Sequence, residues 1–467
     1  MKEILNMKYE VTEKRAAQML GVSTARVSQL VGEALLDAVT INGRVRISAE
    51  SIAVYQRESK RPGRPARTSY ATASRHTLMN GPYEVAEVVY DTALDEPLAV
   101  EAVLDASRAP FGVLTTGGRP KKRELNEWWT HRAVPGSRPG LDAKLLRLGV
   151  DSPANLAVRS MGLSLSDCYW LRPEASPQLT WSEVNFFENP FVESSPTGWD
   201  DWLSGVGLSS PDNTSEGELP KKWVSDSMGA RYLLKGCKSD DQRPYNEAVA
   251  TALCRRLLAP EDFVAYDVVM TADGPASRCA NFLSGREEYV PAAQLKDLGG
   301  RIRAASNFDR FCRTVASLGA DEAHGRRMMA KMVVCDIVLA NADRHWRNFG
   351  FIRDIDTLEL RPAPLFDAGN SLWFSKSQRE VDADDHLFRA LPFGPDVPGA
   401  LACIDDLDWF DPKALDGFAD EACDILRASR HATQPGRLDF IHRGLAANIA
   451  RVRDAADVLV RRIARDR

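Results

Sequence analysis

The chain has 467 residues, enough for roughly two to four domains, and its 44% hydrophobic and 27% charged residues are ordinary for a folded protein. These values exclude wholesale disorder, collagen and a disulfide scaffold. The first residues carry charges every few positions, unlike a signal peptide, and no run of about eighteen apolar residues predicts a membrane span. The eight cysteines are scattered without a C-x-x-C pair, which favours reduced thiols and a cytoplasmic location.

Charge is unevenly distributed along the chain. The first 70 residues carry 12 Lys and Arg against 7 Asp and Glu, whereas the remainder carries 48 against 58. A basic head on an acidic body indicates that only the head meets a polyanion. The net charge of -5 therefore describes neither part.

Residues 10–58 predict two helices, a hairpin and a third helix. Thr12 begins the first helix, Gly21 ends it, and Ser23 caps the second. Asn42-Gly43 between two apolar runs is a hairpin signal. Two helices joined by a short glycine turn are typical of helix-turn-helix proteins, and the stretch resembles the excisionase/MerR-like winged helix domains. The residues expected to reach DNA are Thr24, Arg26, Ser28, Gln29 and Arg44.

A basic segment stiffened by proline, KRPGRPAR at 60–67, resembles the Gly-Arg-Pro core of an AT-hook. Proline keeps such a segment extended, so Arg64 would lie in a narrow minor groove. Two alternatives stay open: a solvated linker, and a helical head that binds protein. From residue 70 to about 215 aromatic residues are frequent without a catalytic constellation, and the Trp128-Trp129 pair is interpreted as core.

From Gly217 onward the charged residues predict chemistry. Two β-like runs flank a small-residue tip, and the second run places Lys235 at its end. Such a tip lets backbone N–H groups approach phosphates, and the lysine adds a compact positive charge. A helix expected after Pro244 carries Glu247 in its first turn, where the helix dipole favours a carboxylate. The functional alternative is a salt bridge that holds Lys235, as in protein kinases.

A helical stripe runs into ANADRHWRNFGF, where Asp343 and Asn348 have the spacing of the kinase catalytic loop. There the aspartate accepts the proton of the attacking hydroxyl and the asparagine reaches Mg²⁺. In PAPLFDAGN an apolar run delivers Asp367 to the place of the kinase D-F-G aspartate. Asn348, Asp367 and water would supply the oxygen ligands that Mg²⁺ prefers.

These motifs, N-x-D-R-H-x-x-N followed by L-F-D-x-G, resemble those of the HipA-like serine/threonine kinases, the toxin kinases of bacterial persistence modules. The resemblance spans about residue 217 to the C-terminus and implies ATP and Mg²⁺ as cofactors. It makes Asp343 the general base, and Asn348 with Asp367 the metal ligands. It also implies that Lys235 contacts the ATP phosphates and that Arg344 and His345 brace the catalytic loop.

The resemblance also implies that phosphorylation of a serine in the phosphate-binding loop silences the kinase. By position that serine is Ser225 or Ser227, in the same loop as Gly229. A phosphate there would place nearly two negative charges where ATP phosphates must lie. In modules of the family that this chain resembles, the antitoxin is a separate helix-turn-helix protein, whereas this chain is expected to carry its own helix-turn-helix domain. Toxicity and an antitoxin-like partner are therefore left open.

The expected fold is α+β: a two-lobed kinase-like body with a β-rich N-lobe and a helical C-lobe, preceded by a winged helix-turn-helix domain. The expected function is ATP-dependent phosphorylation of a serine or threonine in a protein, with DNA bound through residues 1–67 and no membrane contact. Two alternatives remain, a DNA-binding regulator whose kinase fold only senses nucleotide and a small-molecule kinase. The expected segments are 1–60 (head), 61–75 (linker), 76–215 (packing on the kinase), 216–292 (N-lobe) and 293–467 (C-lobe).

Overall fold

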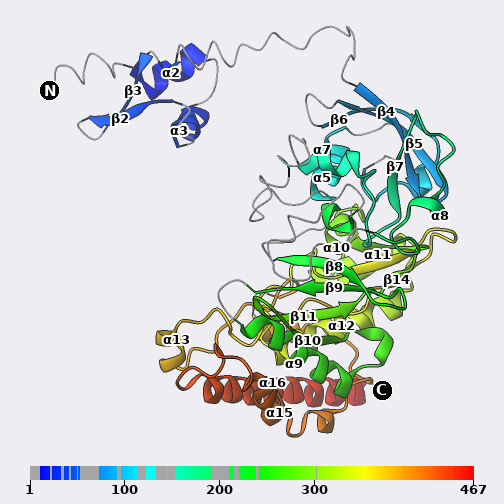
Figure 1. Ribbon diagram of the computed structural model, residues 1–467. Helices are drawn as coiled ribbons and strands as arrows, with labels where there is room; N and C mark the ends of the chain where they lie inside the picture. The colour runs from blue at the N-terminus through cyan, green and yellow to red at the C-terminus, as the bar shows by residue number, and fades with distance from the viewer. Residues whose placement is uncertain are drawn as a thin grey trace. The chain divides into compact units, whose positions relative to one another are not determined.

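The computed structural model divides the chain into two compact units, Met1–Ala71 and Thr72–Arg467 (Figure 1). Both contain helices and small antiparallel sheets, so the expected α+β class is confirmed. No helix among the described residues is long and apolar enough to cross a bilayer. The structure describes residues 11–20, 24–32, 36–41, 44–49, 51–52, 73–91, 96–113, 122–132, 145, 153–191, 210–214, 220–237, 241–300, 302–394 and 396–466.

In the N-terminal unit two helices and a hairpin lie where the sequence predicts them. Thr12 caps the first helix, since its hydroxyl accepts from the Arg15 N–H at 3.2 Å. The sheet order is β1-β3-β2, and Ile41 pairs with Arg44 across the expected turn. A small core closes around Ala16, Val27, Leu30 and Ile47. The elements are β1 (Val11–Thr12), α2 (Glu13–Leu20), α3 (Thr24–Gly32), β2 (Ala38–Ile41) and β3 (Arg44–Ile47).

The second unit begins with a four-stranded antiparallel sheet of order β6-β5-β4-β7. Trp128 and Trp129 are 8% and 2% exposed and pack against this sheet, so their interpretation as core is confirmed. The strands and helices of this segment are β4 (Ala73–Asn80), β5 (Tyr83–Asp91), β6 (Glu96–Val103), α5 (Lys122–Arg132), α7 (Pro153–Arg159), β7 (Tyr169–Pro173) and α8 (Trp181–Val184).

A second four-stranded sheet, of order β10-β11-β9-β8, lies beside helix α9 (Gln242–Leu257) (Figure 1). The predicted start of this helix is wrong: it begins at Gln242, two residues before Pro244. A proline is tolerated there because the first N–H groups of a helix have no partner within it. Glu247 is therefore not in the first turn. The strands are β8 (Lys221–Ser225), β9 (Arg231–Lys235), β10 (Tyr266–Thr271) and β11 (Gly274–Ala280).

The rest of the chain is largely helical around one three-stranded sheet of order β12-β13-β14. Helix α12 is buried along most of its length, and α15 and α16 close the far side of the core. The elements are β12 (Glu287–Pro291), α10 (Ala292–Leu295), α11 (Asn307–Ser317), α12 (Glu322–Val338), β13 (Gly350–Asp354), β14 (Leu360–Pro362), α13 (Gln378–Asp382), α14 (Val397–Leu401), α15 (Phe418–Leu426) and α16 (Arg437–Asp466).

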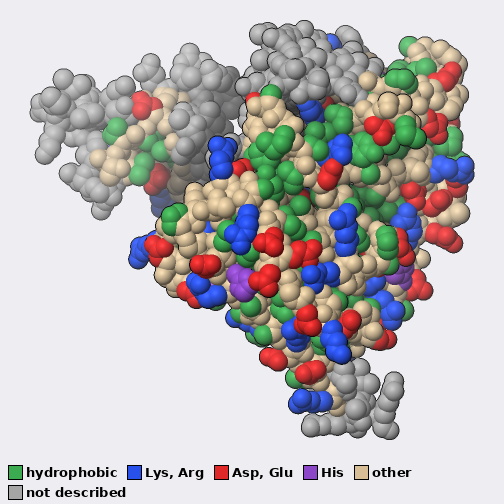
Figure 2. Space-filling model, turned by 60° about the horizontal axis from the view of Figure 1, so that its bottom comes forward, with side chains coloured by type: hydrophobic (Ala, Val, Ile, Leu, Met, Phe, Trp, Pro, Cys, Tyr) green, Lys and Arg blue, Asp and Glu red, His purple; other side chains and the backbone are tan. Residues whose placement is uncertain are grey.

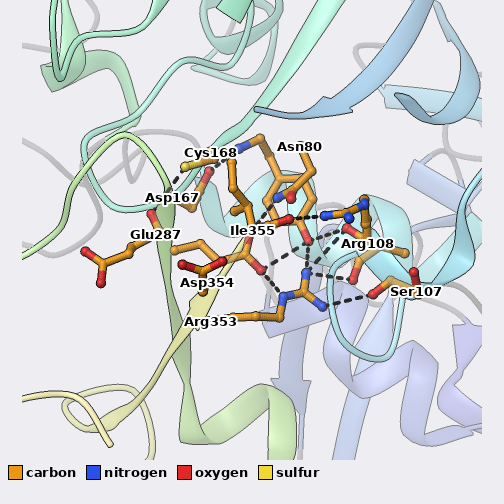
Figure 3. Close-up of polar contacts among 12 residues, drawn as sticks. Asn80, Ser107, Arg108, Asp167, Cys168, Glu287, Arg353, Asp354 and Ile355 are labelled. Atoms are coloured by element: carbon orange, nitrogen blue, oxygen red, sulfur yellow. Dashed lines mark hydrogen bonds and ion pairs between the residues drawn. The ribbon is translucent and has the colours of Figure 1, made fainter. Parts of the chain in front are cut away.

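A buried polar network joins the first sheet of this unit to β12 and β13 (Figure 3). Arg353 on β13 pairs with Glu288 on β12, and both side chains are almost fully buried. Asn80 at the end of β4 donates to the same carboxylate at 2.7 Å. Arg108, which follows β6, donates to the carbonyl of Ile355, which follows β13. The network fixes the segment before residue 215 to the strands that follow it.

Acidic and basic side chains are interspersed over the face of the molecule drawn in Figure 2. No single-sign patch covers the described surface on that face. All eight cysteines are free in the structure.

Candidate active site

A cavity of about 770 Å³ opens beside the β8–β11 sheet and gathers residues that are far apart in the sequence. Lys235 comes from the end of β9 and Glu247 from the middle of α9. Asp343 and Asn348 come from the loop after α12, and Asp367 from the loop after β14. The tertiary structure therefore brings these five residues, all predicted from the sequence, to the lining of one cavity.

Lys235 lies between two carboxylates. Its Nζ is 2.8 Å from Asp367 Oδ1 and 3.7 Å from Glu247 Oε1. Glu247 also accepts from the N–H of Ala368 at 3.0 Å, which ties the helix to the residue after Asp367. The salt bridge that the sequence offered as the functional alternative for Glu247 thus forms.

Burial and neighbouring charges shift the pKa values of Lys235, Glu247 and Asp367 in different directions. Burial alone would lower the pKa of Lys235, but the Asp367 and Glu247 carboxylates outweigh it and raise that pKa above its ordinary value. Burial raises the pKa of Glu247 to about 7, against the opposing field of Lys235. Asp367 is 39% exposed, and the adjacent ammonium holds its pKa at about 2 although burial acts in the opposite direction. Asp367 is therefore the carboxylate that stays ionised for a cation.

The loop that carries Asp343 and Asn348 is held by a buried arginine. The guanidinium of Arg344 makes a two-pronged contact with Asp336 on α12, at 2.8 and 3.0 Å. It also donates to the carbonyls of Asn348 and Phe366, each at 2.6 Å. Although burial acts to lower it, the pKa of Arg344 is raised by Asp336. One buried cation thus ties the loop of Asp343 to the loop of Asp367.

Asp343 is anchored through its main chain and its carboxylate. Its N–H donates to Asn341 Oδ1 at 3.1 Å, and the Asn348 amide donates to its carbonyl at 3.0 Å. The Asn370 amide donates to its carboxylate Oδ2 at 2.6 Å. Since the amide nitrogen of Asn348 is used in this way, its amide oxygen is the group that remains for a cation. His345 is exposed and accepts from the Arg347 N–H at 3.2 Å.

The hairpin tip between β8 and β9 lies outside the lining of the cavity. Asp226 fills this turn with its own side chain, because Oδ1 accepts from the N–H groups of Met228 and Ala230, both at 2.9 Å. These bonds hold the pKa of Asp226 below its usual range. Gly229 has φ +85°, a conformation that glycine accepts readily. Neither Ser225, Ser227 nor Gly229 lines the cavity.

Aromatic and apolar side chains form the other wall of the cavity, near the end of β11. Phe282 stacks on Phe366 with 5.7 Å between ring centroids, and Tyr289 meets Phe366 edge-on. The segment CANFLSGREEYVPAAQL, at residues 279–295, supplies part of this wall. A flat apolar ring would be held between such side chains.

Three residues of this site were missed from the sequence: Asp336, Asn341 and Asn370. Asp336 had a signal, since it is a lone acid in the apolar helical run KMVVCDIVLA, and a buried carboxylate requires a partner. Asn341 and Asn370 had none, because loop asparagines are common and nothing in their spacing marks a bond. Of the predicted DNA contacts, Thr24 and Ser28 are exposed on α3. The side chains of Arg26, Gln29 and Arg44, and all of Arg64, lie outside the described residues.

The donor set fits a hard divalent cation that is bound together with phosphate. Asp367 offers a carboxylate and Asn348 an amide oxygen, and both line the cavity. The described residues contain no group of three or more His, Cys, Asp or Glu side chains that could hold a metal by themselves. Mg²⁺ commonly binds through one or two protein oxygens plus substrate phosphates, so this sparse set suits it.

Comparison with known proteins gives only distant structural likenesses. No family model matches the chain, and no curated protein matches it. The Helicobacter pylori proinflammatory kinase CtkA is 18% identical over 53% of this chain and 95% of its own, with a TM-score of 0.40. HipA of a Shewanella oneidensis MR-1 toxin-antitoxin system, solved with HipB and operator DNA, is 15% identical over 82% of this chain and 99% of its own, with a TM-score of 0.49. Likenesses of this size establish no function.

Proposed function

We propose that the protein is an ATP-dependent, HipA-like kinase that transfers the γ-phosphoryl group to a serine or threonine hydroxyl of another protein. The observation that carries this proposal is the cavity itself, which is lined by the bonded pair of Lys235 and Asp367 together with Asp343 and Asn348. The β8–β11 sheet with α9 would act as the N-lobe, and the helices around α12 as the C-lobe. Phosphoryl transfer demands positioning and charge stabilisation, which these residues supply.

Each residue has one task in this mechanism. Lys235 holds the nucleotide phosphates, and Glu247 keeps the lysine in place. Mg²⁺ held by Asp367 and Asn348 would neutralise charge on the phosphates. Asp343 orients the acceptor hydroxyl and takes its proton. Arg344 keeps the loops of Asp343 and Asp367 in register.

Labelled ATP incubated with the purified protein and a host lysate tests the proposal. We expect labelled protein with the wild type and none with Asp343→Gln, while the two proteins melt at the same temperature. Label on metabolites alone would support a small-molecule kinase instead. ATP binding without any transfer would support a nucleotide-sensing regulator. Equal labelling by wild type and Asp343→Gln would refute the assignment of the base.

We further propose that residues 1–67 bind DNA, through α3 and the hairpin of β2 and β3. The helix pair, the exposed Thr24 and Ser28, and the positive charge of this part of the chain support it. The full-length protein should bind duplex DNA with an affinity that falls steeply with salt. Arg26→Ala should weaken binding, whereas Arg427→Ala, on the second unit, should not. Salt-independent or absent binding would contradict this proposal, and an antitoxin-like partner would then be the other candidate for the head.

A further inference from the structure

The loop that follows Asp367 is held in a strained conformation. Asp367, Leu372 and Trp373 have φ of 61°, 54° and 50°, and Ala340, before the catalytic loop, has φ of 51°. Residues with a Cβ rarely adopt left-handed backbone, and it persists only where the surroundings hold it. Such strain is often found where a loop must deliver a side chain to a site.

Buried side chains of two helices hold this loop by its carbonyl groups. Asn246 and Gln242, both fully buried, come from the first half of α9, and Arg437 from the start of α16. A buried amide or guanidinium that donates to main-chain carbonyls resists any local shift of the loop. The bonds are Asn246 to Gly369 (2.8 Å) and Ser371 (2.9 Å), Gln242 to Leu372 (3.2 Å), and Arg437 to Trp373 (3.0 Å).

The held loop lies against the catalytic loop. The Ala342 N–H donates to the Asn370 carbonyl at 3.3 Å, and the Leu372 N–H donates to the Leu339 carbonyl at 2.8 Å. Between these two main-chain bonds the Asn370 side chain meets the Asp343 carboxylate at 2.6 Å. Main-chain hydrogen bonds therefore hold the backbone on both sides of this contact.

The chemistry of the contact has one direction. An ionised carboxylate only accepts hydrogen bonds, so the amide nitrogen of Asn370 is the atom that faces it. The bonds from Asn348 and to Asn341 involve the main chain of Asp343, whereas Asn370 bonds to carboxylate Oδ2. With Oδ2 held, the carboxylate plane is set and Oδ1 remains for an incoming hydroxyl.

We propose that Asn370 is a positioning residue, which fixes the Asp343 carboxylate so that one oxygen is presented to the acceptor hydroxyl. This inference rests on the kinase function proposed above. Asn370 acts through Asp343 and contacts no nucleotide in this role. Its loss therefore affects the transfer step rather than ATP binding.

Two substitutions of Asn370 separate orientation from packing. Asn370→Ala removes the donor, and we expect kcat to fall about 10- to 100-fold, the worth of one hydrogen bond to a charged group, with the KM for ATP within about twofold. Asn370→Asp keeps the shape of the side chain but sets a second negative charge against Asp343. We expect it to be slower than Asn370→Ala. A packing role predicts the reverse order, since aspartate fills the same space.

A second set of measurements isolates the coupling to Asp343. In an Asp343→Glu background, which keeps a carboxylate but moves it away from Asn370, Asn370→Ala should cause a smaller loss of rate than it does in the wild type. Thermal melting of every variant checks that the fold is retained. Two results would overturn this inference while the wild type still transfers phosphate. One is an Asn370→Asp variant that is at least as active as Asn370→Ala. The other is an Asn370→Ala variant in which only the KM for ATP rises. A wild type that transfers no phosphate to any acceptor would overturn the proposed function and, with it, this inference.

Discussion

Two buried pairs of a basic residue with a glutamate lie in the second unit of the molecule. Arg353 with Glu288 joins β13 to β12, and Lys235 with Glu247 joins β9 to α9. The side chains of the first pair are 3% and 2% exposed, and neither lines the large cavity. The second pair opens onto that cavity and shares its lysine with Asp367, which is 39% exposed.

The two pairs differ in how completely their charged groups are surrounded by hydrogen-bond partners. Glu288 accepts from Asn80, and Arg353 donates to main-chain carbonyls and to Tyr169, so both charges of this pair are enclosed by hydrogen bonds, although Asn80 Oδ1 has no hydrogen-bond partner (Figure 3). At the cavity Lys235 is shared between Asp367 and Glu247 next to open space, where the Asp367 carboxylate stays partly exposed. An enclosed pair adds structure, whereas a pair that opens onto a cavity can meet a cation and a polyphosphate. The predictions below test this division.

The largest effect is expected at the open cluster. Asp367→Asn removes the proposed metal ligand and should lower phosphoryl transfer about 1000-fold or more, while the protein stays folded because Lys235 keeps its ion pair with Glu247. Kinetics with labelled ATP and a melting curve measure both quantities. Asp424→Asn removes an exposed carboxylate on α15 and serves as the matched control without loss of rate. Transfer by Asp367→Asn at the control rate would remove Asp367 from the site.

The closed cluster should respond in the opposite way. Arg353→Met leaves Glu288 buried without its partner and should lower the free energy of unfolding by about 3–5 kcal/mol. The rate per folded molecule should stay unchanged. Adding Glu288→Gln removes the stranded charge and should recover part of the stability. Denaturant unfolding measures these differences, and a stable Arg353→Met protein that has lost activity would break the division between the two clusters.

Glu247 predicts a dependence of stability on pH. Its pKa is raised to about 7 from 4.5, so the folded state binds this proton more tightly than the unfolded chain does. The stabilisation is fully present below pH 4.5 and is lost as pH rises through about 7. Glu247→Gln mimics the protonated form. Its melting temperature should fall less between about pH 5 and about pH 8 than that of the wild type. An unchanged slope would place the titrating group elsewhere.

The smallest effect is expected at the hairpin tip. Ser227 is exposed beside Asp226 and outside the cavity, so Ser227→Ala should change the initial rate of transfer less than about twofold. After incubation with Mg-ATP we expect mass spectrometry to find one phosphate on Ser225 or Ser227, and a second round of transfer to be slower than the first. Neither serine modified, or a large change in the initial rate, would contradict these expectations.

The motifs that hold Asp343, Asn348 and Asp367 were the part of the candidate site that could be predicted from the sequence. Asp343, Asn348 and Asp367 stand in local patterns whose spacing reflects one loop each, and a local pattern is readable without the fold. Lys235 and Glu247 were predicted as a pair only as an alternative, because their contact depends on how α9 packs beside β9. At the hairpin tip the prediction of free N–H groups did not take Asp226 into account, since a side chain in the turn competes for the same donors.

The sequence by itself determined the α+β class, the two helices and hairpin of the head and the buried Trp128-Trp129 pair, because each follows from periodicity, turn chemistry or residue pattern. Only the tertiary structure decided which side chains meet across these elements. Asp336 reaches Arg344, Asn370 reaches Asp343, and Arg353 reaches Glu288 through packing between segments distant in the chain. Such contacts depend on the relative placement of whole elements, which no local pattern of residues encodes.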